Sequence, residues 1–267
     1  RNDNAIDITV TTLAANAESG IYVSESDGLT VTTVDSLRVD IESVVRVNFN
    51  STTIDVSEDQ VAASLEDLST DRDGPIKVVS ESGTLTIAGG SDGQGVSAAG
   101  SGDVLLEARG SGGNVVINAE VVSVSGNITL DAGNDLTVSS SVSTGGLGTV
   151  YMVAVNEITV TESVITVSGD ILVEAGTNLS QDAAITSTSG DVGLIAGGTL
   201  VQTSTGDITT GGDVLVWAGT DWTMAGDAVI TAIGNVVGEA LGGDIGLGVI
   251  SSTNVALTAS DLSLIHI

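Results

Sequence analysis

An eight-residue motif recurs through the C-terminal two thirds of the chain, and this repetition limits the possible folds more than any other feature. Seven of its eight copies have glycine in second place, and all eight end in alanine. The copies are SGDVLLEA (101–108), SGNITLDA (125–132), LGTVYMVA (147–154), SGDILVEA (168–175), SGDVGLIA (189–196), GGDVLVWA (211–218), IGNVVGEA (233–240) and STNVALTA (252–259). Their starts lie 19–24 residues apart. A period this short indicates a solenoid, in which each repeat packs against its neighbours.

Each repeat has room for three short strands and no helix. Aliphatic residues alternate within the motif, as in Val104, Leu106 and Ala108, which predicts a strand with these side chains on one face. A second short strand is expected at 135–138, 157–160, 178–181 and 221–224, and a third at 141–143, 164–167, 183–186 and 228–231. The alanine that ends every copy suggests an inside corner too tight for a larger side chain. The predicted fold is all-β, a single parallel β-helix with three strands per coil of about 21 residues.

The repeat is interrupted once, near the N-terminus. We expect N-terminal solenoid coils at 1–34, an insertion at 35–73 and β-helix repeats at 74–261. The insertion is predicted to contain a hairpin followed by a short helix. Ser57 and Gln60 fit a helix capping box, and Val61, Leu65 and Leu68 would share one helical face. Repeat proteins often carry binding features in such insertions.

The charge balance excludes several classes of partner. The 267 residues include 35 acidic and 6 basic ones, which gives a net charge of −29. Such a surface repels nucleic acid and anionic membranes, so no nucleic-acid partner is expected. No apolar run approaches the ~18 residues of a membrane span, so no membrane insertion is expected. The absence of cysteine excludes disulfides and thiol chemistry.

Glycine–Asp/Asn–strand–alanine units of this length resemble the shafts of large bacterial surface proteins of the filamentous-haemagglutinin type. The resemblance covers 75–259 well and 5–34 less closely, and the secretion domain of that family is not recognisable. It implies a right-handed helix and a structural, non-catalytic segment of an adhesin or exoprotein at the bacterial cell surface or outside the cell. The implied partners are other domains of the same long polypeptide and host or matrix glycans or proteins. A start at Arg1 without a signal peptide also predicts a piece of a longer protein.

The only histidine, His266, lies in the last six residues, LSLIHI (262–267). These residues depart from the repeat. They are similar, in all six positions, to the translation of the mosaic-end adapter of transposase-based sequencing libraries, CTGTCTCTTATACACATC. We therefore interpret 262–267 as a non-native scar and exclude His266 as a site.

A glycan-binding or polysaccharide-cleaving β-helix is the alternative function, because pectin-active enzymes share this architecture. Their acidic substrates require Lys or Arg beside grouped carboxylates. The basic residues here are Arg1, Arg38, Arg46, Arg72, Lys77 and Arg109, and none follows Arg109. The sequence therefore favours a protein that is not an enzyme, although cleavage of a neutral sugar by two carboxylates stays open.

A column of acidic residues is the candidate metal site. Asp170, Asp191 and Asp213 follow the turn glycine in consecutive coils and should stack. Calcium would relieve their repulsion with oxygen ligands, which predicts a calcium ladder and no other cofactor. In the alternative, each side chain binds the backbone of its local turn and faces water.

Large apolar residues at outward positions form the candidate contact surface. They are Tyr151, Leu172, Ile195, Leu215 and Trp217. A contiguous patch of this kind often marks an interface, and the candidate partners are the insertion, a neighbouring domain or a sugar stacked on Trp217. Intramolecular packing is the alternative. Trp222 is assigned to the core instead, in an inward column with Leu136, Ile158, Leu179 and Leu200.

Overall fold

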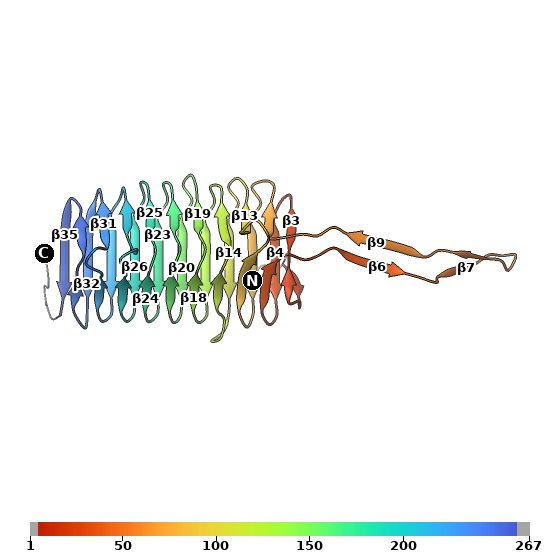
Figure 1. The fold of residues 1–267 in the computed structure, drawn as a ribbon, viewed down its shortest axis with the longest axis horizontal. Helices are drawn as coiled ribbons and strands as arrows, with labels where there is room; N and C mark the ends of the chain where they lie inside the picture. Colours follow the sequence, from red (N-terminus) through yellow and green to blue (C-terminus); the bar gives the residue numbers. More distant parts are fainter. Residues whose placement is uncertain (1–4, 261–267) are drawn as a thin grey trace.

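The chain forms a parallel β-solenoid from which one hairpin projects (Figure 1). The structure is a computed structural model that describes residues 5–260. Within that range it contains 35 strands and no helix. Three parallel sheets of 11, 10 and 10 strands, here called sheets A, B and C, run the length of the solenoid. Ten coils each contribute one strand to each sheet, and the last described strand, in sheet A, belongs to an eleventh, which confirms the predicted architecture.

The strands of each sheet follow one another at the repeat period. Sheet A contains β1 (Ile6–Ile8), β4 (Ile21–Glu25), β11 (Ile76–Ser80), β14 (Val104–Ala108), β17 (Ile128–Ala132), β20 (Val150–Ala154), β23 (Ile171–Ala175), β26 (Val192–Ala196), β29 (Val214–Ala218), β32 (Asn235–Ala240) and β35 (Asn254–Ala259). Sheet B contains β2 (Thr12–Leu13), β5 (Leu29–Thr32), β12 (Leu85–Gly89), β15 (Val115–Ile117), β18 (Leu136–Val138), β21 (Ile158–Val160), β24 (Leu179–Gln181), β27 (Leu200–Gln202), β30 (Trp222–Met224) and β33 (Ile245–Gly246). Sheet C contains β3 (Ala15–Ala17), β10 (Leu68–Thr70), β13 (Gln94–Ala98), β16 (Glu120–Ser123), β19 (Val142–Thr144), β22 (Val164–Thr166), β25 (Ile185–Ser187), β28 (Ile208–Thr210), β31 (Val229–Ala232) and β34 (Val249–Ser251).

The core consists of columns in which equivalent residues of successive coils lie on one another. In sheet B, Leu136 pairs with Ile158, and the column continues through Leu179, Leu200 and Trp222. All five side chains are buried, as predicted. The alanines that end the sheet A strands also stack, and Ala108 to Ala240 are buried at the corner toward sheet B. Because the alternate residues of each strand face outward, the core is one aliphatic filling along the axis.

Glycine is required at the corner between sheets C and A because successive coils approach closely there. A Cβ atom built on Gly190 would lie 2.3 Å from the carbonyl oxygen of Gly169 in the preceding coil. The equivalent distance from Gly126 to the carbonyl oxygen of Gly102 is 2.2 Å. No side chain fits at these distances. The glycine column is therefore a packing requirement between coils as well as a turn signal.

Buried hydroxyl groups satisfy the carbonyl groups at this corner. The hydroxyls of Ser123 and Ser187 donate to the carbonyl oxygens of Gly102 and Gly169, at 2.8 and 2.9 Å. The Thr144 hydroxyl donates to the carbonyl oxygen of Gly126 at 2.6 Å. Because an unpaired buried carbonyl is costly, the serine or threonine that ends these sheet C strands is part of the corner's structure.

The insertion is a hairpin without a helix, so the predicted helix is wrong. Strand β6 (Leu37–Ile41) pairs antiparallel with β9 (Glu58–Ala62), and β7 (Val45–Val47) pairs with β8 (Thr53–Asp55). Ser57 caps no helix, since its amide and hydroxyl donate to Asp55. Leu68 does not share a face with Val61, because it is a fully buried residue of the solenoid strand β10. The solenoid therefore resumes at Leu68, earlier than the sequence boundary at 73.

We expect the substitution Gly190→Ala to lower the free energy of unfolding by about 1–3 kcal/mol, because the added methyl group must displace the preceding coil. Gly226→Ala is the matched control, since no atom lies within 4 Å of a Cβ built there. It should change stability by less than about 0.5 kcal/mol. The midpoint of urea unfolding, followed by circular dichroism, measures both. Equal midpoints for the two variants would contradict the close-approach explanation.

Candidate binding groove on sheet A

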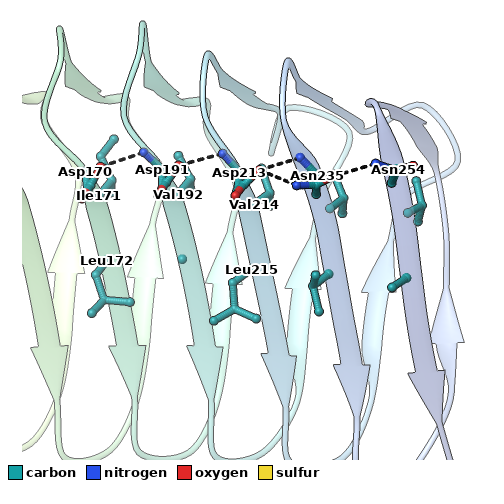
Figure 2. Close-up of a pocket in the computed structure, with 15 residues that line it drawn as sticks. Asp170, Ile171, Leu172, Asp191, Val192, Asp213, Val214, Leu215, Asn235 and Asn254 are labelled. Carbon is teal, nitrogen blue, oxygen red and sulfur yellow. Dashed lines mark hydrogen bonds between the residues drawn. The ribbon is translucent and has the colours of Figure 1, made fainter.

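A shallow apolar groove crosses the outer face of sheet A in the C-terminal half of the solenoid (Figure 2). Its volume is about 640 Å³, and it spans five coils. The lining residues are Asp170, Ile171, Leu172, Asp191, Val192, Gly193, Asp213, Val214, Leu215, Asn235, Val236, Val237, Asn254, Val255 and Ala256. The groove runs along the solenoid axis, across the strands, so its shape suits an elongated ligand.

The groove exists because small residues interrupt one outward column of sheet A. Leu172 pairs with Gly193, which pairs with Leu215. Figure 2 shows the side chains of Leu172 and Leu215 standing out from the sheet on either side of this gap. The column continues through Val237 to Ala256, where the side chain is again small. The apolar floor thus depends on the glycine in SGDVGLIA.

One edge of the groove is a ladder of Asp and Asn side chains that hydrogen-bond from coil to coil (Figure 2). The Oδ1 atom of Asp170 accepts the backbone N–H of Asp191 at 2.8 Å, and Asp191 Oδ1 accepts that of Asp213 at 2.7 Å. Asp213 Oδ1 accepts both the backbone N–H and the side-chain amide of Asn235, at 2.6 and 3.1 Å. The side-chain amide of Asn254 donates to Asn235 Oδ1 at 2.8 Å.

These bonds give the acidic column a structural function. The carboxylates accept hydrogen bonds from the backbone of the following coil. The alternative in which each side chain binds the backbone of its own turn is therefore wrong about the hydrogen-bond partner. The described residues contain no group of three or more His, Cys, Asp or Glu side chains that could hold a metal ion. The predicted calcium ladder at Asp170, Asp191 and Asp213 therefore has no preformed cage in residues 5–260.

The five residues of the predicted contact surface all lie on the outer face of sheet A, in two neighbouring outward columns. Leu172 and Leu215 line the groove. Ile195 pairs with Trp217 in a separate outward column, and both are half-buried. Tyr151 lies beside Leu172, and its hydroxyl donates to a Glu174 carboxylate oxygen. The hairpin projects from the other end of the solenoid and does not cover this face (Figure 1).

Tyr151 is held in its neutral form at physiological pH. Burial raises the pKa of the Tyr151 hydroxyl to about 12, and the hydrogen bond to the Glu174 carboxylate acts in the same direction. A phenol in this state is a hydrogen-bond donor and not a base. Tyr151 therefore donates a hydrogen bond to Glu174 on the next strand of sheet A and provides no base to the groove.

The groove was missed because it depends on one residue that breaks an outward column. Gly193 is visible in the repeat alignment as the outward position without a side chain. The extension of the polar ladder through Asn235 and Asn254 was also visible, as the Asp/Asn position of the repeat. His266 and the proposed scar at 262–267 lie outside the described residues.

Comparison with known protein families, curated proteins and solved structures finds no match to this chain. Within residues 5–260 there is no helix long and apolar enough to cross a membrane.

The ladder predicts a difference between two substitutions of Asp191. Asp191→Ala removes the acceptor of the Asp213 N–H group and should lower stability by about 1 kcal/mol. Asp191→Asn keeps a side-chain oxygen at this position, so the urea midpoint should stay at or above that of the unchanged protein. Adding calcium or a chelator should shift neither midpoint. If calcium instead raised the urea midpoint of the unchanged protein and Asp191→Asn abolished this rise, the metal ladder would be established.

Proposed function

We propose that this chain is a rigid, non-catalytic shaft segment of an extracellular bacterial adhesin or exoprotein of the filamentous-haemagglutinin type. In this function, the solenoid holds binding regions of the same polypeptide away from the cell. Host or matrix glycans or proteins would be the distal partners. The proposal rests on the repeat motif and on the mechanical character of the fold.

The observation that carries the proposal is the continuous pairing of all three sheets. Sheet A continues without interruption from β1 to β35, and the parallel register is kept at each step. Every coil adds backbone hydrogen bonds in three sheets and lengthens the solenoid by ~4.8 Å. A ladder of 11 strands thus spans about 50 Å. Such a rod resists bending because a bend would break hydrogen bonds in at least one sheet.

The distribution of charge supports a structural function. No Lys or Arg follows Arg109, so the C-terminal half has no cation to bind an acidic substrate. Asp170, Asp191 and Asp213 recur at equivalent corner positions, where they accept backbone N–H groups of the following coil. The groove carboxylates stand in one row along one edge. Glycosidic cleavage by two carboxylates needs an acid and a base on opposite sides of the bond, which this row does not supply.

The proposal is tested at the source locus and on intact cells. Long-read sequencing through both ends should show a frame that continues into more repeats of about 21 residues and an export signal upstream. Protease treatment of intact cells should then remove the solenoid from the surface, with a cytoplasmic protein as the protected control. A short reading frame without an export signal, or full protection from protease, would contradict the proposal.

The groove favours a second candidate function, binding of an elongated partner, such as a glycan chain, along sheet A. Its five-coil length and apolar floor are the supporting observations. Gly193→Leu should fill the groove and weaken binding to immobilised polysaccharide at least tenfold. Thr209→Leu, on the exposed face of β28, is the matched control and should bind as the unchanged protein does. Binding that survives Gly193→Leu would exclude the groove as the site.

A further inference from the structure

Three Asn-x-Ser/Thr motifs occur in the chain, and this motif is the acceptor sequence of N-linked glycosylation. They begin at Asn50, Asn127 and Asn178. The motifs at Asn127 and Asn178 run into the solenoid strands β17 and β24, whereas Asn50 lies in the turn of the projecting hairpin, between β7 and β8. The fold thus places the same short motif in two different environments.

The Asn50 motif forms the tip of the hairpin. The Ser51 N–H donates to the Asn48 carbonyl oxygen at 2.9 Å, and the Asn48 N–H donates to the Thr52 carbonyl oxygen at 2.8 Å, which closes a loop of three residues. Ser51 has a φ of 67°, the left-handed conformation expected of the last residue in such a loop. Asn50, Ser51 and Thr52 are all exposed, and the hairpin carries them away from the solenoid (Figure 1).

Hydrogen bonds within the motif fix the orientation of the Asn50 carboxamide. Its Oδ1 atom accepts the Thr52 hydroxyl at 2.6 Å and the Thr52 backbone N–H at 3.2 Å. Its Nδ2 atom donates no hydrogen bond within residues 5–260. The hydroxyl that the motif requires in third place therefore holds the oxygen of the acceptor amide and leaves its nitrogen free to react.

The motif at Asn127 is locked between coils. The Nδ2 atom of Asn127 donates to Asp103 Oδ1 at 3.0 Å, and its Oδ1 atom accepts the N–H and the hydroxyl of Thr149 in the next coil. Ile128, the middle residue of the motif, is fully buried, and its strand pairs with a neighbour on each side. An enzyme could bind this segment only after pulling a strand out of sheet A.

The motif at Asn178 is held in a similar way. The Oδ1 atom of Asn178 accepts the N–H of Thr199 in the next coil at 3.1 Å. Leu179, the middle residue, is 2% exposed, and β24 pairs with β21 and β27. The Ser180 hydroxyl donates to Asp182 instead of to the acceptor amide. Neither solenoid motif therefore reproduces the exposed turn at Asn50.

The local charge also favours the tip of the hairpin. The donors for this reaction are glycosyl diphosphates, which are anions, and a chain of net charge −29 repels them. Residues 43–54 contain one basic residue and no acidic one. The acceptor nitrogen of Asn127, in contrast, contacts a carboxylate.

We propose that Asn50 is a site of N-linked glycosylation, and that Asn127 and Asn178 are protected by the folded solenoid. A glycosyltransferase supplies the sugar from a glycosyl diphosphate, either a nucleotide sugar or a lipid-linked one. The Asn50 Nδ2 atom attacks the anomeric carbon and forms a C–N bond. The bond from that carbon to the diphosphate oxygen breaks, the diphosphate leaves with the electron pair, and one amide proton passes to a base of the enzyme. This modification is independent of the shaft function.

Incubation of the folded 267-residue chain with UDP-glucose and a soluble N-glycosyltransferase that recognises Asn-x-Ser/Thr tests the proposal. Peptide mass spectrometry should find one hexose on Asn50 and none on Asn127 or Asn178. Synthetic peptides 46–54, 123–131 and 174–182 should all accept the sugar, because no solenoid protects them. A parallel reaction with a membrane-bound oligosaccharyltransferase and a polyprenyl-diphosphate oligosaccharide distinguishes the lipid-linked donor from the nucleotide sugar.

Substitutions at the tip test the function of the hydroxyl. Thr52→Ala should lower the rate of transfer to Asn50 at least about tenfold, and Thr52→Ser, which keeps a hydroxyl, should restore it. Thr53→Ala is the matched control, since Thr53 is the exposed neighbour outside the motif. It should leave the rate within about twofold. Circular dichroism confirms that all three variants keep the solenoid.

The chain isolated from its source cells should carry a sugar on the peptide that contains Asn50. An unmodified Asn50 in that material would overturn the proposal, as would a folded chain that accepts no sugar from either donor. Equal transfer to all three motifs of the folded chain, or peptides 123–131 and 174–182 that accept none, would show that the solenoid is not what protects Asn127 and Asn178. Equal loss of transfer in Thr52→Ala and Thr53→Ala would contradict the function of the hydroxyl.

Discussion

The structure depends on the stacking of each coil on an equivalent copy of itself at the spacing of a β-ladder. At ~4.8 Å, a residue meets the same position of the coils above and below it. Each position must therefore be compatible with itself. Aliphatic side chains satisfy this condition by van der Waals packing, glycine by the absence of a side chain, and Asp or Asn by accepting an N–H group from the next coil. Most of the repeat motif follows from this condition.

The same constraint explains why the solenoid could be predicted and why the second half of the insertion was predicted as a helix instead of a strand. From β11 onward, the strand pairing of the solenoid joins residues about one period apart, so the repeat in the sequence shows which strands pair. The contact between β6 and β9 joins residues about 20 positions apart in a segment with no repeat. Val61 and Leu65 are spaced as on one face of a helix. The local sequence does not show that Val61 pairs with the strand at 37–41. Non-local pairing therefore overrode a plausible local pattern.

The candidate site was only partly predictable for a related reason. The residue type at inward positions is restricted by packing in the core, so a residue that departs from the aliphatic pattern there is recognisable in the sequence. Outward positions have no such rule, so the glycine at position 193 is visible in the repeat alignment but does not by itself indicate a groove. The groove arises only from Gly193 between Leu172 and Leu215. The polar ladder, in contrast, was recognisable as a column, and only the partner of each carboxylate was misassigned.

Trp222 shows how the stack tolerates a residue that is not compatible with its column. The indole fills space that the sheet A column of the next coil would otherwise occupy, and a Cβ built on Gly238 would lie 2.3 Å from Trp222 Cζ3. The indole N–H, fully buried, donates to Gln202 Oε1 at 2.8 Å, and the Gln202 amide donates to Gln181 Oε1 at 2.9 Å. One large residue thus requires a glycine in the following coil and an amide in the preceding one. A departure from the repeat is stable here because three neighbouring coils change together, and substitutions at these positions are therefore coupled rather than additive.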